Sequence, residues 1–429
     1  MFSFDKNKYI VLLQKVFPLA LLALLTMLGV VSFFRGEKPY FRDFENRAET
    51  SFPEWSKEDW LDGKYQDELK AAVTDYQPYI FNAKQTYFYI RNSLLLSFQK
   101  SHYNFSDYYV HFIKNINLVG DTVNQYLLYP NLKMNTDQEW TAQYIIHRFD
   151  EVARNNPRTE FYLYYVTTDK DFHFDKNYRE SNYDKIRSWL TLPEGHVSCL
   201  ELKDFEQYKR FFYKTDHHWQ CFGSYQGYKD VFQMLRLAEQ GETLMCPKEP
   251  DSTMVGVPDD DPPAVTDGAR AVLVSRYMHG SKSRATGTRG QFFGKVYVYN
   301  FDYVPMSITK DGEPFQYGNP ELYLSNQDFD REYNIWYGAV FGGDTGELIF
   351  DTGRTDRPDI LVIGDSFDNA VLKLLAGHYN RLYSVDLRHY ERQKNEPFNI
   401  DNYIKDHQIN TVLFFANVTL YVSETFMHF

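Results

Sequence analysis

Cysteine is scarce in this sequence, and basic residues are outnumbered by acidic ones. The 429 residues include three cysteines, Cys199, Cys221 and Cys246, with no CxxC spacing. This excludes a disulfide framework and a cysteine-based zinc site, although it leaves one bridge plus one free thiol open. The 46 Lys and Arg residues against 58 Asp and Glu give a formal net charge of −12, and they form no basic stripe. We therefore expect no binding to nucleic acid.

Signature motifs of nucleotide and metal enzymes are also missing. The sequence contains no HExxH, Walker or GxGxxG motif, so we expect neither a cofactor nor a motif-bound metal. Charged residues make up 24% and hydrophobic residues 43%, as in soluble globular domains, so most of the chain should fold. The 35 Phe, 35 Tyr and 6 Trp residues suit both β-rich cores and sugar-stacking grooves.

One long apolar run lies near the amino terminus. Val16–Phe34 has 19 residues without a charge, preceded by Lys6, Lys8 and Lys15 and followed by Arg35. At about 1.5 Å per residue it covers ~28 Å, close to the ~30 Å of a bilayer's hydrocarbon core. The run does not end in the small-x-small cleavage site of a signal peptide, so we expect an uncleaved membrane anchor. A buried core helix is the alternative. Because a short first tail usually stays inside, the rest of this single-pass protein should be extracytoplasmic.

We expect the chain to divide into three parts. Residues 1–35 would form a short cytoplasmic tail and the anchor, and residues 36–130 an irregular, aromatic-rich connecting region. Residues 131–429 would form an α/β domain, with a β-rich insertion at about 250–350. Short strand-like runs such as Tyr333–Phe341 indicate that insertion.

Helix and strand patterns alternate within the third part. A capping box at Thr136–Glu139 begins a helix in which Trp140, Tyr144, Ile145 and Phe149 recur at helical spacing, and the strand Glu160–Val166 follows. Beyond the insertion come strands Asp359–Ile363, Leu382–Leu387 and Thr411–Phe415 and helices Asp368–Ala376 and Ile400–Asp406. Strands separated by helices predict a doubly wound parallel sheet with helices on both faces, whose site lies at the carboxyl ends of the strands.

Ser366 is the candidate nucleophile. The apolar strand before it ends in Gly364-Asp365-Ser366, which places one hydroxyl at a strand-to-helix turn. Free amides of the following helical turn can hold a developing oxyanion there. The alternative is a serine that only caps a helix.

The segment Tyr213–Trp219 supplies an acid and two imidazoles. Residues two apart on an extended segment face the same side, which favours Asp216 as the partner of His218 rather than of His217. In that pairing Asp216 would orient His218, and His218 would take the serine proton. A rival interpretation makes Asp216, His217, His218 and Cys221 a metal site, although adjacent histidines diverge on a strand.

These motifs together resemble a known family. The runs YKTDHHW, VIGDSFDNAV, LYSVDLRHY and VLFFANV are similar to those of the bacterial DHHW family, which is related to the SGNH-hydrolase-like alginate O-acetyltransferases of the AlgJ and AlgX type. Those relatives have Asp-x-His ahead of a Trp, and the serine in Gly-Asp-Ser. The resemblance therefore implies an SGNH-like fold, in the permuted order with the serine last, and a triad of Asp216, His218 and Ser366.

The same resemblance assigns further site residues. It implies that Trp219 and His217 lie at the substrate site and that Asn369 or Asn417, with Asn369 preferred, is the second oxyanion donor. Arg388 would bind an acidic substrate group or else form a salt bridge with a nearby carboxylate, for which Asp386 is the candidate.

The family's activity implies a membrane-anchored, extracytoplasmic O-acetyltransferase acting on a bacterial surface or exported polysaccharide. Its expected partner is a polytopic membrane O-acyltransferase that passes the acetyl group across the bilayer. Two alternatives stay open: an acetylesterase with the same triad, and a non-catalytic polysaccharide-binding or assembly protein.

Overall fold

The structure is a computed structural model, and it describes two compact units of the chain. One unit comprises residues 1–102 with 287–289, and the other comprises residues 103–286 with 290–429. The described residues are 51–75, 126–173, 178–250, 269–278, 280–286, 293–318, 337–427 and 429, together with 16, 20, 23, 24, 26, 27, 86, 87, 90, 91, 94, 111–113, 116–119 and 320. The domain boundaries expected near residues 35 and 130 stay predictions.

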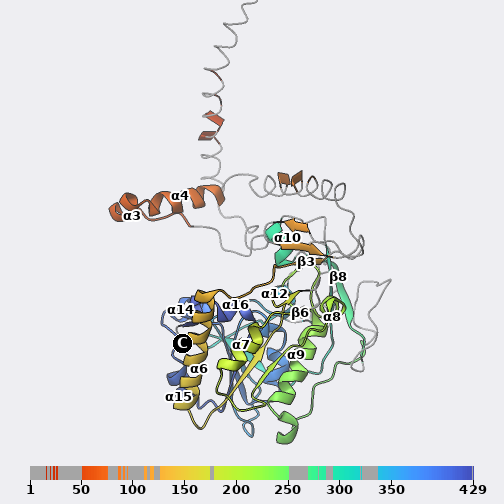
Figure 1. Cartoon of the computed structure of the whole chain (residues 1–429). Helices are drawn as coiled ribbons and strands as arrows, with labels where there is room; N and C mark the ends of the chain where they lie inside the picture. Colours follow the sequence, from red (N-terminus) through yellow and green to blue (C-terminus); the bar gives the residue numbers. More distant parts are fainter. Residues whose placement is uncertain are drawn as a thin grey trace, which may run out of the picture. The chain divides into compact units, whose positions relative to one another are not determined.

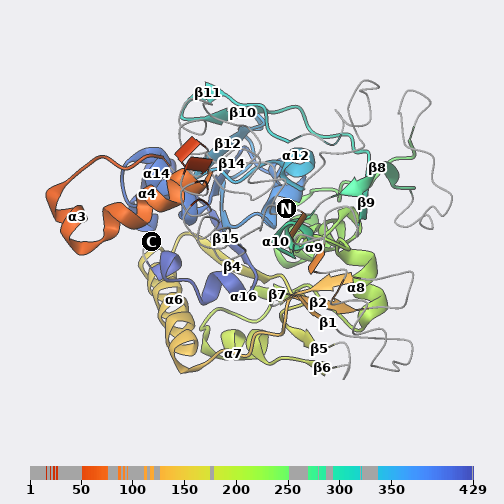
Figure 2. The same cartoon turned by 90° about the horizontal axis from the view of Figure 1, so that it is seen from above.

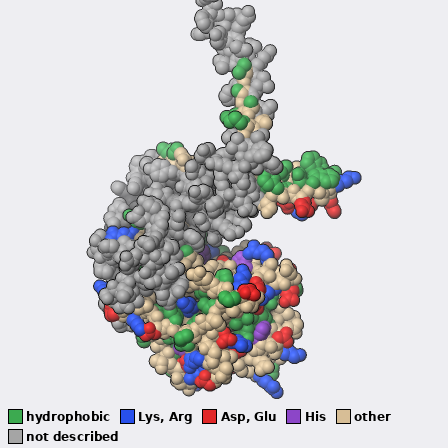
Figure 3. All heavy atoms as spheres, turned by 180° about the vertical axis from the view of Figure 1, so that it is seen from behind, with side chains coloured by type: hydrophobic (Ala, Val, Ile, Leu, Met, Phe, Trp, Pro, Cys, Tyr) green, Lys and Arg blue, Asp and Glu red, His purple; other side chains and the backbone are tan. Residues whose placement is uncertain are grey.

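The first unit contains two described helices, α3 (Lys57–Asp62) and α4 (Lys64–Asp75). Ser56 caps α3, because its hydroxyl accepts a hydrogen bond from the backbone N–H of Asp59. Trp55, Trp60 and Leu61 are exposed, and Figure 3 shows hydrophobic side chains along one side of these helices and acidic ones along the other.

The predicted anchor Val16–Phe34 lies almost wholly outside the described residues. Only residues 16, 20, 23, 24, 26 and 27 of this run are described, and all six are helical. Within the described part of the chain, no helix has the length and apolar character needed to cross a bilayer.

A mixed sheet forms the centre of the second unit. Its described strands follow the order β11-β10-β12-β14-β13-β15-β4-β7, and those from β14 to β7 run parallel (Figures 1 and 2). The bounds are β4 Glu160–Tyr165, β7 Val197–Cys199, β10 Ser307–Lys310, β11 Glu313–Pro314, β12 Glu347–Asp351, β13 Ile360–Gly364, β14 Arg381–Val385 and β15 Thr411–Ala416. The predicted α/β fold is confirmed, although the sheet is only mostly parallel, because β10, β11 and β12 pair antiparallel.

Two hydrophobic cores cover the two faces of this sheet, as the strand sequences require. Along β13, Ile360 and Val362 belong to one core, whereas Leu361 and Ile363 belong to the other, because successive side chains alternate across a strand. Helices α8 (Phe205–Phe211), α9 (Cys221–Met234) and α13 (Leu372–Ala376) pack on the first face. Helices α6 (Thr136–Asn155), α7 (Asn182–Trp189), α14 (Leu387–Lys394), α15 (Ile400–His407) and α16 (Val418–Tyr421) pack on the second.

The β-rich insertion is only partly a separate element. Strands β10 to β12 pair antiparallel and extend the central sheet, since β12 bonds to β14 along its whole length. Strands β8 (Val272–Met278) and β9 (Gly294–Val298) form a separate irregular hairpin. The strand expected at Tyr333–Phe341 is wrong, because Tyr337–Phe341 forms the short helix α12 and residues 333–336 lie outside the described residues.

Smaller elements complete the second unit. They are the sheet of β1 (His111–Ile113), β2 (Ile116–Val119) and β3 (Tyr126–Leu128), the pair β5 (Phe172–His173) and β6 (Tyr178–Arg179), helix α10 (Ser281–Thr286) and the 3-10 turns Leu237–Gln240, Asp368–Ala370 and Glu424–Met427.

Helix α6 begins one residue earlier than the sequence suggested. Its N-cap is Asn135, whose side chain exchanges hydrogen bonds with Gln138 in a capping box, so the box expected at Thr136–Glu139 is wrong. Both residue pairs have the right spacing, and Asn is the stronger N-cap than Thr. On this helix Phe149 is 1% exposed, whereas Tyr144 is 43% exposed.

Two substitutions on α6 test this assignment of its faces. Phe149→Ala should lower the free energy of unfolding by about 3–5 kcal/mol, because it empties a site packed against Phe161 and Phe414. Tyr144→Ala, on the exposed side, should change it by less than about 1 kcal/mol. Urea unfolding curves of both variants measure the difference, and equal losses would contradict the burial described.

Candidate active site

Ser366 lies at the carboxyl end of the central strand β13. The strand ends at Gly364, and Asp365 and Ser366 then lead into the 3-10 turn that precedes α13. Gly364 leaves no room for a side chain, since an added Cβ would overlap the Asp368 carboxylate and come within 2.8 Å of the Phe415 carbonyl oxygen. This close approach of the turn to strand β15 places the Ser366 hydroxyl at the edge of the sheet, at 8% exposure for the residue.

The base and the acid come from the loop between α8 and α9. That loop is closed by a bridge between Phe212 and Trp219, and the backbone N–H of Tyr213 donates to the carbonyl of His218. His218 Nε2 lies 2.6 Å from Ser366 Oγ, and His218 Nδ1 lies 2.6 Å from Asp216 Oδ1. The structure therefore joins Asp216, His218 and Ser366 in one continuous hydrogen-bonded chain.

Aromatic contacts hold the His218 ring in place. The Tyr337 ring stacks on it with a centroid distance of 3.9 Å and an interplanar angle of 5°. The His217 ring lies 3.8 Å away and the Phe367 ring 5.2 Å away. Since stacking on a flat ring opposes tilting, the imidazole is oriented before any substrate arrives.

The segment before and within α10 fixes the acid, and the sequence carried no signal for it. The backbone N–H of Ser281 donates to Asp216 Oδ2 at 2.6 Å, while the backbone N–H of His218 donates to Asp216 Oδ1 at 3.0 Å. An added Cβ at Gly280 would collide with Thr215 and Asp216, so the two segments are in direct contact. Asp216 is 1% exposed, and these donors satisfy its buried carboxylate.

A small cavity opens at the Ser366 hydroxyl. It has a volume of about 150 Å³ and is lined by Tyr129, Thr168, Asp169, Lys170, His217, Asp365, Ser366, Phe367, Arg388, Asn417 and Thr419. Residues that follow β4, β13, β14 and β15 in the chain all contribute to this lining, as expected for the carboxyl edge of a parallel sheet.

His217 lines the cavity without joining the hydrogen-bonded chain to Ser366. Its Nδ1 lies 2.6 Å from Ser281 Oγ, and its side chain is 34% exposed. Burial, followed by the neighbouring His218, lowers the pKa of His217 well below 6.5. A neutral imidazole at the cavity wall suits the substrate-binding position suggested for His217.

Two cationic side chains reach the cavity. Arg388 bonds to both oxygens of Asp386, at 2.9 Å from Nε to Oδ1 and 2.5 Å from Nη2 to Oδ2, and lies 3.2 Å from Asp344. The salt bridge considered for Arg388 is therefore present, while the side chain still faces the cavity.

Lys170 is the second cation, and sequence reasoning missed it. Its Nζ donates to Thr419 Oγ1 at 2.8 Å and lies 4.9 Å from the centroid of the Tyr129 ring. Among the described residues no carboxylate lies within 4.0 Å of this ammonium, and burial lowers the Lys170 pKa. A cation without an acidic partner beside the nucleophile is suited to an anionic group or a developing negative charge.

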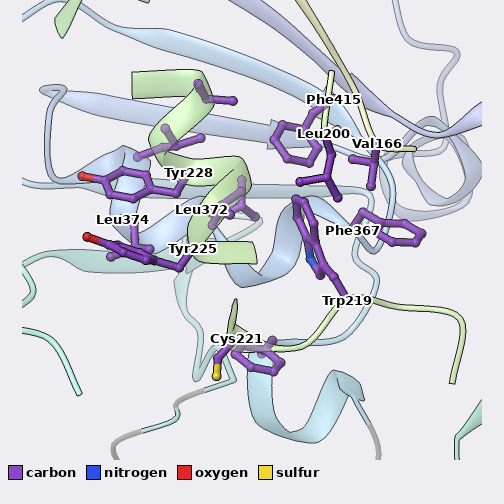
Figure 4. Close-up of a cluster of buried hydrophobic side chains, with 14 of the residues drawn as sticks. Val166, Leu200, Trp219, Cys221, Tyr225, Tyr228, Phe367, Leu372, Leu374 and Phe415 are labelled. Atoms are coloured by element: carbon purple, nitrogen blue, oxygen red, sulfur yellow. The ribbon is translucent and has the colours of Figure 1, made fainter. Parts of the chain in front are cut away.

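The structure does not place Trp219 at the cavity. Trp219 is fully buried and packs against Phe367 and Phe415, with both ring centroids 5.7 Å away, in the core below the site (Figure 4). The assignment of Trp219 to substrate binding is therefore wrong for this structure. Its indole instead supports the turn that carries the nucleophile.

Asn417, not Asn369, reaches the cavity wall. The Asn369 amide donates to the Gly342 carbonyl at 3.1 Å and its oxygen accepts from the Tyr317 hydroxyl at 2.9 Å. Asn417 lines the cavity, caps α16 through its side-chain oxygen and donates one amide hydrogen to Asp365 Oδ2 at 2.8 Å. The preference for Asn369 fails because its side chain is held by neighbours away from Ser366.

In the described part of the chain, two groups of side chains have the spacing to hold a metal ion. Asp216, His217 and His218 place one ligand atom each within 4.8 Å of one another, as do Asp344, Asp386 and His389. In the first group, Asp216 and His218 already bond to each other. Cys221 does not belong to either grouping, and the three cysteines are free thiols.

Two buried carboxyls lie in the turn after β13. Burial raises the pKa of Asp365 to about 6, although Arg388 opposes the shift. Burial, followed by repulsion from Asp365, raises the pKa of Asp368 well above 3.8. Asp368 therefore favours its protonated form in the folded protein.

Asp368→Asn tests this electrostatic arrangement. A raised carboxyl pKa gives a contribution to stability that is complete below the ordinary pKa and is lost as the pH rises toward the folded-state pKa. The unfolding free energy of the wild type should therefore fall relative to Asp368→Asn from about pH 4 upward, by up to about 1.4 kcal/mol per pH unit. Urea unfolding across this range measures the difference. Parallel pH profiles would contradict it, and exposed Asp356→Asn controls for the loss of one charge.

Comparisons with known proteins find solved structures that are similar to this chain. No family model and no curated protein matches it. Bacillus cereus PatB1 with a sulfonyl adduct is 17% identical, with a TM-score of 0.50 over 75% of this chain and 99% of that chain. A DHHW family protein from Eubacterium siraeum is 15% identical, with a TM-score of 0.48 over 74% and 95%. The O-acetyltransferase domain of Pseudomonas putida AlgJ is 10% identical, with a TM-score of 0.37 over 74% and 93%.

At these identities the likeness concerns the fold. The chain shares with PatB1 an α/β fold that has a mostly parallel central sheet. The matched structures include a DHHW family protein and the AlgJ domain, relatives of the kinds that the sequence resemblance names.

Proposed function

We propose that this protein is an O-acetyltransferase that uses Asp216, His218 and Ser366 to move acetyl groups onto a polysaccharide outside the cytoplasm. The observation that carries the proposal is the chain of two 2.6 Å contacts from Asp216 through His218 to Ser366. Such a chain lets a serine, a weak nucleophile by itself, lose its proton as it attacks. The sequence resemblance to alginate O-acetyltransferases supports an acetyl group and a sugar acceptor.

The first half-reaction forms an acetyl-serine. His218 Nε2 takes the Ser366 proton while Ser366 Oγ bonds to the acetyl carbonyl carbon of the donor. Asp216 stabilises the imidazolium that results. The tetrahedral intermediate collapses, the bond to the donor's leaving group breaks, and His218 returns the proton to that group.

The second half-reaction transfers the acetyl group. His218 takes the proton of a sugar hydroxyl, and the sugar oxygen attacks the acetyl carbon of the acyl-enzyme. The bond to Ser366 Oγ breaks, and His218 reprotonates the serine. Water entering in place of the sugar would give hydrolysis, so the outcome depends on how well the acceptor excludes it.

Asn417 and Lys170 are the proposed stabilisers of the oxyanion. Both line the cavity beside Ser366, and Asn417 retains a second amide hydrogen. The backbone N–H of Phe367 is engaged by Asp365 Oδ1 at 3.0 Å, so that amide does not face the cavity as a free donor. Each oxyanion donor is typically worth ~3–4 kcal/mol of transition-state stabilisation.

The cellular setting is part of the proposal. The uncharged run Val16–Phe34 would anchor the protein in the membrane with the catalytic unit outside. Acetyl-CoA is not present there, so the donor would come from a polytopic membrane O-acyltransferase, the partner that the family resemblance implies.

Trapping of the acyl-enzyme tests the nucleophile. Purified protein treated briefly with p-nitrophenyl acetate should gain one acetyl group on the peptide that contains Ser366, and phenylmethylsulfonyl fluoride should modify the same residue. Ser366→Ala should remove both modifications and lower turnover at least about 10³-fold. Exposed Ser188→Ala is the matched control. Undiminished labelling in Ser366→Ala would refute the assignment.

Partition of the acetyl group separates transferase from esterase. With a soluble oligosaccharide acceptor, acetylated oligosaccharide should accumulate faster than free acetate, because a bound sugar displaces water from the acyl-enzyme. Asp216→Asn should slow both products about 10³- to 10⁴-fold without changing their ratio. Acetate as the sole product across acceptors and concentrations would favour the esterase instead.

A further inference from the structure

A second recess lies on the outer surface of helices α6 and α7, apart from the catalytic cavity. It has a volume of about 470 Å³ and is lined by Trp140, Gln143, Tyr144, His147 and Trp189, here called the α6–α7 groove. Trp140 and Tyr144 are 59% and 43% exposed, and their rings stack with centroids 5.8 Å apart. Isolated apolar residues on a surface are ordinary, but stacked large aromatic rings that line a recess indicate a binding surface.

The side chains that line the groove favour a neutral, ring-shaped ligand. None of the five lining residues is Asp, Glu, Lys or Arg, which disfavours a nucleic acid, an acidic glycan or a basic peptide. Flat indole and phenol faces pack against the C–H face of a pyranose ring, which is apolar. The Gln143 amide and the His147 imidazole offer both donors and acceptors for the hydroxyl groups at its edge.

The loop after β4 contributes both to the catalytic cavity and to the position of the helices that form the groove. The loop after β4, which supplies Asp169 and Lys170 to the cavity, also anchors the chain just before α6. There the Leu132 N–H donates to the Lys170 carbonyl at 2.8 Å, and the Asn131 amide donates to the Asp169 carbonyl at 3.1 Å.

Helix α7 begins at the same place. The side chain of Asn182 donates to the Leu132 carbonyl at 2.7 Å and to Asp171 Oδ1 at 3.1 Å. Helices α6 and α7 thus start side by side at the cavity loop (Figures 1 and 2). Since a helix rises 1.5 Å per residue, Trp140 to His147 lie about 6 to 17 Å along α6 from its first residue.

The volumes of the two recesses favour different roles, with the reacting group in the catalytic cavity and the polymer in the groove. The catalytic cavity, at about 150 Å³, is small for a ligand site and suits the reacting group alone. A polymeric acceptor must then be held by another surface of the same unit, and the groove, at about 470 Å³, falls within the usual range for ligand sites.

We infer that the α6–α7 groove binds a neutral pyranose segment of the polysaccharide and so holds the chain beside the catalytic cavity. The identity of the ligand as the acceptor polymer rests on the proposed function, whereas sugar binding at the groove does not require catalysis. Trp140 and Tyr144 supply the stacking platform, and Gln143 and His147 supply hydrogen bonds.

Binding of two neutral probes tests the inference. The pentamers of β-1,4-linked N-acetylglucosamine and of β-1,4-linked glucose are titrated into the full chain carrying Ser366→Ala, so that no turnover disturbs the equilibrium. At least one pentamer should bind saturably. Adding Trp140→Ala should weaken that binding about tenfold or more, because a stacking face is lost. Trp140→Phe should recover part of the loss, and Gln143→Ala should weaken binding less than Trp140→Ala.

The control is Trp55→Ala, which removes another exposed tryptophan, on the first unit, and should leave the affinity unchanged. Thermal unfolding of each variant checks that the fold is intact, as expected for an exposed position.

Several results would overturn the inference. In the titrations, these are the absence of saturable binding of either pentamer and equal affinities of the Trp140→Ala variant and its parent. In separate measurements, they are a dimer of the parent protein that Trp140→Ala abolishes, and binding of the parent protein to phosphatidylglycerol vesicles that Trp140→Ala abolishes. The last two would make the groove a contact between copies or with lipid. If the pentamers bind as described but Ser366 is never acylated, the proposed function fails while the groove stands.

Discussion

The hydrogen bond between His218 Nε2 and Ser366 Oγ is the contact on which the site depends, since it joins residues 148 positions apart in the chain. One end is fixed by the central strand β13 and the tight turn at Gly364. The other is fixed by the loop between α8 and α9, where Tyr337 stacks on the imidazole. Because both ends are held by packed elements, the 2.6 Å approach needs no rearrangement on substrate binding, and the base is pre-organised for proton transfer.

Burial makes this arrangement sensitive to its supports. The Asp216 carboxylate is almost fully enclosed, so each of its partners compensates for lost hydration, and the backbone N–H of Ser281 is one of them. Burial raises the pKa of Asp368 well above 3.8, which favours a neutral carboxyl in the turn that carries the nucleophile. A neutral Asp368 favours the oxyanion that the attack of Ser366 creates more than a charged one would.

Local sequence patterns predicted the elements that carry the triad but not all of the cavity around it. The apolar strand that ends in Gly364-Asp365-Ser366 could be predicted because a buried parallel strand has a continuous run of apolar residues. Asn417 was identified only as the alternative to Asn369. Lys170 and Ser281 could not be found this way, since tertiary packing alone brings their segments to the site. Trp219 was misplaced for a related reason, because a large aromatic residue next to a catalytic histidine serves a core as readily as a substrate. Tyr337–Phe341 combines aromatic and β-branched residues typical of strands, yet it forms a helix whose first residue stacks on His218.

The state of the His218 ring in solution tests the account most directly. With ¹⁵N-labelled histidine, NMR spectra should contain an imidazole that carries its proton on Nδ1, toward Asp216, and accepts a hydrogen bond from Ser366 at Nε2. That resonance should disappear in His218→Gln, and in Ser366→Ala its Nε2 shift alone should move toward that of an unbonded nitrogen. A His218 spectrum that is identical with and without the Ser366 hydroxyl would contradict the triad.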